Sequence, residues 1–460
     1  MANQENQNLK SLLDSFMQAV RPITERRAKR FQNLMGFVLD GQQWTASEVK
    51  ERNGDETYTF NFSEDFVERF MARLFPRNPR TGVIEIGAKV YESDKDLKNK
   101  YNEAIMDCYA ENSFITTLLE QGINYLVGGS GCFYFPKDPI TKKIKIISLD
   151  PQMVYLGWRG NTLVQFAYDE YLGISASDVN SVPQVTILGK KRTTYWDLEN
   201  VCVFENGEIV KQWKNEDGEI PFAWIPCMPK PRSHEGRSKI ESLYDLDRAY
   251  NLAASDYAKR NAENTNPERV IFSDSLGAKD SDKFTRGRKQ THFLGKEDDM
   301  RNLELTSGQE VLDFLKMLDD RMKQKTGIVS SAGSVRAQVS GLSLASQYSD
   351  MLDLIGFMRI FWDEAFRKMN SAILQSHFTI GNFRTDPVYQ SFIIQDSKAK
   401  VDEYGAMLDK DLISHRDAID ELRGVENADD KVQEILAEKK LFNSVLPPSN
   451  NQGNNFLNKK

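Results

Sequence analysis

Residues 238–265 read SKIESLYDLDRAYNLAASDYAKRNAENT, and the rest of the architecture is arranged around this segment. Its apolar residues recur at helical spacing on one side, with charges on the other: Ile240, Leu243, Leu246, Tyr250, Ala253, Ala254 and Tyr257. That pattern predicts an amphipathic helix over 239–265, about 40 Å long at ~1.5 Å per residue. The Asn266-Pro267 pair ends it, because proline cannot continue a helix.

A second helix is predicted beyond a short insert. The segment SGQEVLDFLKMLDDRMKQKTG predicts a helix over 307–327, with Ser307 as N-cap and Gly327 just past the C-terminus. The insert, residues 266–306, has strand-like ends, RVIF and THFLG, around a polar middle. This order predicts an antiparallel helix pair with a small α/β insert at its far end.

The segment after the second helix, residues 328–346, is rich in small residues. Of the seventeen residues Ser330–Ser346, eleven are Ser, Ala or Gly, and Arg336 is the only charge. By itself such a segment reads as a flexible surface linker between helices. Beyond it we expect a long helix (about Leu344 to Gln375) and a strand within 347–395, charged helices over 396–445 and a disordered tail over 446–460.

The N-terminal half is predicted to change from helices to strands. Three helical blocks are expected there: 9–35, 64–74 and 94–126. The first is interrupted near Pro22 and carries a basic cluster that faces DNA, scaffold, capsid or solvent: Arg26, Arg27, Lys29 and Arg30. Residues 131–228 consist of short β-branched and aromatic runs, which predict antiparallel strands and hairpins, with ENGE (205–208) as a tight turn.

Composition limits the class of protein. At 460 residues, with 28% charged and 40% apolar residues, the chain is long enough for two to four globular domains. Its net charge of −7, from 60 basic and 67 acidic residues, provides no general field that would collect nucleic acid. The four cysteines are scattered, which predicts neither a disulfide framework nor a zinc site. The N-terminus lacks a signal-peptide pattern and no run reaches ~18 apolar residues, so a soluble protein without membrane segments is expected.

The motifs of common enzymes are missing from the sequence. GGSG at 128–131 lacks the lysine of a phosphate-binding loop, and the four histidines lie far apart without a zinc-protease or nucleophile-elbow motif. Acidic pairs such as Asp319-Asp320 and Asp298-Asp299 are expected on solvated faces of a chain this rich in acids. We therefore expect no catalysis, no cofactor and no metal.

Four stretches, in order, carry a resemblance to tailed-phage portal proteins of the podovirus type. LDGQQWTASEVKERNGDETYTFNF resembles the opening of such proteins, and NYLVGGSGCFYFPKDP with KIKIISLDPQMVYLGW is similar to the portal wing. IPFAWIPC followed by GRSKIESLYDLDRAYNLAASD looks like the passage from the wing into the first stem helix, and VSGLSLASQ resembles the tunnel-loop junction. The resemblance extends from about Gly41 to Glu421.

The resemblance implies an α+β portal fold that forms rings. In this chain its parts would be a wing (1–238), stem helices (239–265 and 307–327), a small α/β clip (266–306), a tunnel loop (328–346), a wing helix and strand (347–395), a short helical crown (396–445) and a tail (446–460). The crown is expected to be short because the C-terminus lacks a long helical barrel.

The resemblance also implies a ring of twelve subunits at one capsid vertex, through which double-stranded DNA is packaged and ejected. The tunnel loop would line the channel with eight residues: Ser330, Ser331, Gly333, Ser334, Arg336, Gln338, Ser340 and Gly341. The clip would dock partners through five basic residues, unless these are simply solvated: Lys279, Lys283, Arg286, Arg288 and Lys289. The implied partners are large terminase, a tail adaptor, and major capsid and scaffolding proteins, in the virion and, during assembly, in the host cytoplasm.

Two other functions compete with this reading. A packaging nuclease or ATPase would need the motifs that the sequence lacks. A ring-forming head-tail adaptor or minor capsid protein without a motor-docking role is the closer alternative, although adaptors are generally much shorter than 460 residues.

Overall fold

The computed structural model describes residues 2–39, 41–52, 57–78, 81–138, 140–176, 185–265, 269–272, 291–294, 309–327, 349–378, 383–390, 397–410, 413–414 and 418. The chain forms two compact units, 1–333 with 347–392, and 334–346 with 393–460. The described part of the second unit includes helix α10 (Ser397–Asp409). The first unit mixes helices and sheets, which confirms the α+β class. No helix in the described ranges is long and apolar enough to cross a membrane.

Helix α1 (Ala2–Val38) is continuous, so the predicted interruption near Pro22 is wrong. Its first half buries Leu13 and Phe16 against the face of a sheet, and its second half buries Leu34 in the main core. Packing at both ends offsets the ~3 kcal/mol that a proline costs inside a helix.

Four shorter helices follow: α2 (Ala46–Glu51), α3 (Phe62–Leu74), α4 (Lys95–Glu111) and α5 (Phe114–Ile123), the last continuing as a π-helical turn, Asn124–Gly128. The helical block predicted over 94–126 is therefore present, divided into two helices. Asn112 ends α4 by donating its Nδ2 to the Cys108 carbonyl at 2.8 Å, and Ser113 adopts a left-handed φ of 49° that a continuing helix does not allow.

Two antiparallel sheets form the β region, as predicted. One has five strands in sequence order: β4 (Val154–Arg159), β5 (Thr162–Ala176), β6 (Val185–Asp197), β7 (Asn200–Glu205) and β8 (Glu208–Lys214). In the other, β2 (Ser130–Tyr134) lies between β3 (Ile147–Ser148) and β9 (Phe222–Pro226). The predicted tight turn is present between β7 and β8, where Asn206 and Gly207 both have positive φ, as the preferred two-residue hairpin turn requires.

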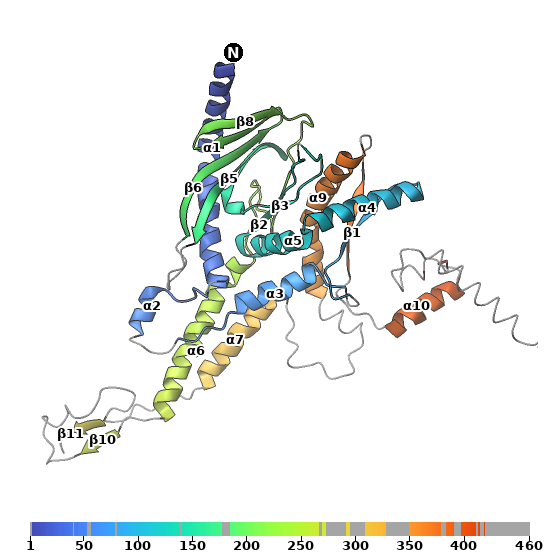
Figure 1. Ribbon diagram of the computed structural model, residues 1–460. Coiled ribbons are helices and arrows are strands. Elements are labelled where there is room, and N and C mark those ends of the chain that lie inside the picture. Colours follow the sequence, from blue (N-terminus) through green and yellow to red (C-terminus); the bar gives the residue numbers. More distant parts are fainter. Residues whose placement is uncertain are drawn as a thin grey trace, which may run out of the picture. The chain divides into compact units, whose positions relative to one another are not determined.

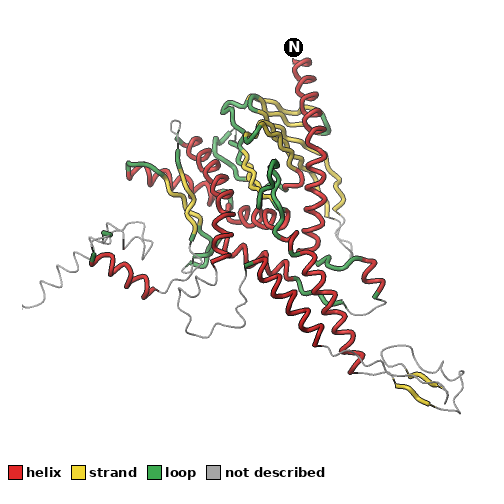
Figure 2. Tube along the Cα trace, turned by 180° about the vertical axis from the view of Figure 1, so that it is seen from behind, coloured by secondary structure: helices red, strands yellow, loops and turns green. Residues whose placement is uncertain are grey.

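Helix α1 covers one face of the five-stranded sheet (Figure 1). The opposite face packs on the three-stranded sheet through Tyr134, Phe166, Trp196 and Phe222. The Trp196 indole donates to the Tyr134 hydroxyl at 3.0 Å, which satisfies both buried polar groups. Figure 2 shows this stack of strands beside the N-terminal helix.

The main core surrounds α9 (Ser349–His377). Trp362, fully buried, contacts the rings of Phe75, Tyr125 and Phe133 from three other elements. Two small pairings complete the fold: β1 (Ile86–Val90) with β12 (Thr385–Tyr389), antiparallel, and β10 (Arg269–Phe272) with β11 (Thr291–Leu294), parallel.

Candidate functional site

The residues that the sequence assigns to the tunnel loop and the clip lie outside the described part of the chain. Eight belong to the loop: Ser330, Ser331, Gly333, Ser334, Arg336, Gln338, Ser340 and Gly341. Five belong to the insert: Lys279, Lys283, Arg286, Arg288 and Lys289. What the structure does describe is the pair of helices from which both segments extend.

Helices α6 (Tyr244–Thr265) and α7 (Gln309–Thr326) form the antiparallel pair that the sequence predicts (Figure 1). At one end Lys325 Nζ donates to the Ser242 carbonyl at 2.8 Å. Further along, burial raises the pKa of Tyr250, and the Asp319 carboxylate of α7 adds to the shift. Gly327 follows α7 with a φ of 65°, as expected of a residue just past a helix.

Helix α6 packs between α7 and an extended segment, 41–61, here called the arm. The arm crosses from α1 to α3 and includes α2, and residues 53–56 of it lie outside the described ranges. Between them, α7 and the arm leave few of the apolar side chains of α6 exposed: Leu243 and Ala254 are buried, and Leu252 is 46% exposed.

A ladder of hydrogen bonds joins the arm to α6. Side chains four residues apart on the helix accept from backbone N–H groups of the arm and of the start of α3: Tyr58 N to Ser255 Oγ (2.9 Å), Phe60 N to Asn251 Oδ1 (2.7 Å) and Ser63 N to Asp247 Oδ2 (3.0 Å). Four helical residues advance ~6 Å, close to the ~6.6 Å of two extended residues, which fits the step from Tyr58 to Phe60. The step from Phe60 to Ser63 takes three residues, because the chain enters α3 there.

Amides and ion pairs extend this contact. Gln43, buried in the GQQW stretch, donates to Asn61 Oδ1 at 2.7 Å and accepts from Asn251. On the outer side of α6, Glu48 pairs with Arg248 and Arg52 with Asp256.

Asp247 is the buried charge of the ladder. Its Oδ2 also accepts from the Ser63 hydroxyl at 2.7 Å, while its Oδ1 has no hydrogen-bond partner among the described residues. Burial raises the pKa of this carboxyl, and the bonds from Ser63 oppose the shift.

The root of α6 is a tight backbone crossing. The Cys227 N–H donates to the Gly129 carbonyl at 2.9 Å, and the Lys239 N–H donates to the Leu126 carbonyl at 3.0 Å. A β-carbon on Gly236 would overlap backbone atoms of Gly129 and Cys227. Two sequence stretches, VGGSG and the segment after IPC, therefore meet at a point where only glycine fits.

The basic cluster of α1 divides into buried and exposed members. Arg27 is buried, pairs with Glu235 at 2.7 Å and lies 4.9 Å over the Trp224 ring. Arg30 donates to the Gly128 carbonyl at 3.0 Å. Both hold α1 against the crossing at the root of α6. The other two members are exposed: Arg26 and Lys29.

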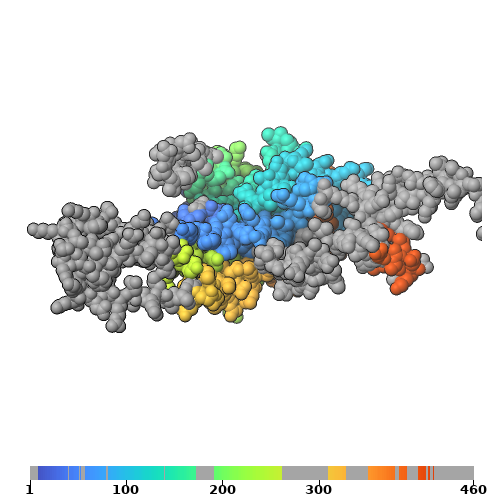
Figure 3. All heavy atoms as spheres, turned by 90° about the horizontal axis from the view of Figure 1, so that it is seen from below, coloured from blue at the N-terminus to red at the C-terminus, as the bar shows by residue number. Residues whose placement is uncertain are grey.

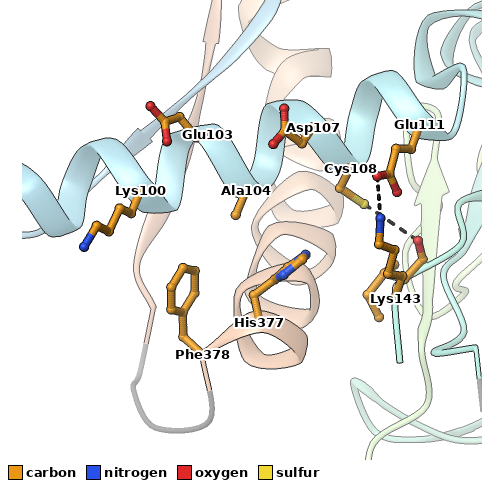
Figure 4. A pocket seen from close by; sticks show the side chains of 10 residues that line it. Lys100, Glu103, Ala104, Asp107, Cys108, Glu111, Lys143, His377 and Phe378 are labelled. Carbon is orange, nitrogen blue, oxygen red and sulfur yellow. Dashed lines mark hydrogen bonds and ion pairs between the residues drawn. The ribbon is translucent and has the colours of Figure 1, made fainter. Parts of the chain in front are cut away.

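A groove of about 310 Å³ lies between α4 and the end of α9 (Figure 4). Ala104 and Phe378 line it, and Lys143 pairs with Glu111 at one end. Burial raises the pKa of the Cys108 thiol to about 11, so this cysteine stays a thiol at neutral pH. Within the described ranges, no group of three or more His, Cys, Asp or Glu side chains could hold a metal ion.

The arm contact was missed at the sequence level, although it left a signal. Asp247, Asn251 and Ser255 recur every fourth residue, which places three small polar acceptors on one line of the helix.

The comparisons with known proteins point to one family. A family model described as "Phage portal protein, SPP1 Gp6-like" matches residues 61–441. No curated protein sequence matches the chain. Similar solved structures include a chain of "Virion of native gene transfer agent (GTA) particle" (11% identity, TM-score 0.41, 85% of this chain and 92% of that chain covered) and one of "Neck of empty GTA particle computed with C6 symmetry" (11% identity, TM-score 0.44, 81% and 91% covered).

Proposed function

Because the chain belongs to the SPP1 Gp6-like family of phage portal proteins, we propose that twelve copies form a ring at one capsid vertex, through which double-stranded DNA enters and leaves the head. The family match over residues 61–441 carries this proposal. Portal proteins are structural and not enzymatic, so the ring acts as a conduit and a docking platform. Its place is the virion, after assembly in the host cytoplasm.

The helix pair supports an assignment of parts. We assign 239–265 and 307–327 to the stem, 266–306 to the clip, and 1–238 with 347–395 to the wing. The crown is assigned to 396–445 and the tail to 446–460. The antiparallel packing of α6 and α7, with the root of α6 fixed at the glycine crossing, suits a stem that projects from a wing.

The loop that follows α7, residues 328–346, is assigned to the channel. A lumen loop must change conformation as DNA passes, and Gly and Ser permit this at low steric cost. Arg336 is the one charge available to touch phosphate, and the acidic chain as a whole keeps DNA from being held. In the clip, the basic residues between Lys279 and Lys289 are assigned to docking of terminase and later of the tail adaptor.

Electron microscopy of the purified protein tests the proposal. Twelvefold rings with a central hole are expected, and a protein that stays monomeric at high concentration would contradict it. Binding assays with large terminase then separate a portal from a ring-forming adaptor or minor capsid protein, which has no motor-docking role.

A further inference from the structure

Helix α7 presents apolar side chains to solvent. Phe314 is 43% exposed and Met317 is 48% exposed, although the adjacent side of the helix buries Leu315 and Leu318. Arg321 follows one turn later on the same line, because positions i, i+3 and i+7 share a helix face. We call Phe314, Met317 and Arg321 the knob.

A small socket lies on α6 and α2. Trp44, Glu48, Arg248, Ala249 and Leu252 line a hollow of about 120 Å³. In liquid water, roughly four molecules occupy that volume. A methionine side chain, with its four heavy atoms, is of comparable size. Asp245 lies one turn before Ala249 on the same exposed line of α6, and Glu48 already neutralises Arg248.

Knob and socket lie on different flanks of the helix pair. Seen from below, α7 (yellow) forms one side, and α6 (lime) shows between it and the N-terminal segments in blue, to which α2 belongs (Figure 3). A contact between them thus joins two different surfaces of the chain. Such head-to-tail contacts generate closed rings when the rotation between copies closes.

The two surfaces also lie at the same level along the helices. Lys325 meets Ser242, and the two antiparallel helices each advance ~1.5 Å per residue. Residue numbers at the same level across the pair therefore add up to nearly the same value. Met317 is therefore level with Leu252. Toward the root of α6, Arg321 lies beyond Met317 on α7. Asp245 lies beyond Leu252 on α6 in the same direction. Rotation about an axis along the stem preserves these levels.

We propose that the knob of one copy inserts into the socket of the next, with Met317 against Leu252 and Trp44, and Arg321 facing Asp245. This inference rests on the proposed ring and names one contact that closes it. The occupant is a second copy of the chain, because apolar positions and opposite charges coincide level by level.

Cysteine cross-linking tests the contact. All four native cysteines are buried, so engineered surface thiols have no native competitor. M317C combined with L252C, and M317C combined with A249C, should each give covalent ladders up to the full ring under mild oxidation. Each single variant is the matched control and should stay a single-chain band, since a head-to-tail contact never places one position against itself.

The outcomes separate this inference from the proposed function. Wild-type rings without ladders in either double variant, or ladders from M317C alone, would overturn the contact and leave the ring intact. A wild-type chain that forms no rings would overturn both. As an independent measure, R321D and D245R should each raise the concentration for half-assembly about tenfold, as the loss of a central charged contact does, and the double variant should restore it. Equal assembly of all four proteins would overturn the charged part.

Discussion

At the scale of the residue, Arg27 shows how a basic cluster on a phage portal protein can be structural. Its guanidinium is buried against Glu235 and Trp224. We expect Arg27→Ala to lower the free energy of unfolding by about 3–5 kcal/mol, because the Glu235 carboxylate loses its partner. Chemical denaturation measures this, and exposed Arg26→Ala is the matched control with a change near zero. Equal losses of unfolding free energy in the two variants would show that the buried Arg27–Glu235 pair does not stabilise the fold.

Asp247 predicts a pH dependence. The pKa of the Asp247 carboxyl is higher in the folded state than in the unfolded state, so the folded state binds the proton more tightly. Burying the charged carboxylate therefore costs no stability below the ordinary pKa, where the group is protonated in both states. The cost appears as the pH rises through the raised pKa. Asp247→Asn keeps an acceptor for Ser63 and removes the buried charge. Its melting temperature at pH 7 should exceed that of the wild type, and the gap should close at about pH 4, near the ordinary Asp pKa of ~3.9. Exposed Asp14→Asn, in α1, serves as control, and a gap that stays constant with pH would contradict the buried-charge account.

At the scale of the element, α1 retains a proline in its interior. Pro22 is exposed, so its replacement creates no cavity. Pro22→Ala should stabilise the protein by up to ~3 kcal/mol by restoring a backbone hydrogen bond and relieving the ring clash. Urea denaturation measures the gain. A loss of stability would mean that the proline shapes α1 to fit the sheet.

The elements also show what a sequence can and cannot predict. Helical periodicity located α3, α6 and α7, and the Asn-Gly pair located the β7–β8 turn, because these signals are local. The break at Ser113 and the continuity at Pro22 were both missed, since each depends on contacts with distant residues: Ile144 for the Asn112 cap, and the sheet under α1 for the proline. The ladder between α6 and the arm was missed for the same reason. The channel and clip residues stay predictions.

At the scale of the whole molecule, the segment assigned to the tunnel loop yields a functional test. Gly341→Val should restrict the backbone of this segment and Arg336→Ala should remove its one charge, while rings still assemble, because neither variant removes a large apolar side chain. We expect less DNA per prohead from both. Exposed Gly356→Ala, in α9, is the matched control, with normal packaging. Normal packaging by both loop variants would make the segment a linker, and failed ring assembly would make it structural.

The ladder between the arm and α6 also fixes the axial position of the helix. Its rungs recur every ~6 Å along the helix, but on the other side they are two residues apart and then three, where the chain enters α3, so the match is restricted to these few rungs. A slide of the helix by one residue, ~1.5 Å, breaks every rung at once, and the rungs realign only after a step of four residues. Small axial displacements of α6 are therefore not absorbed gradually along the arm: the helix stays seated, or the whole contact is released together.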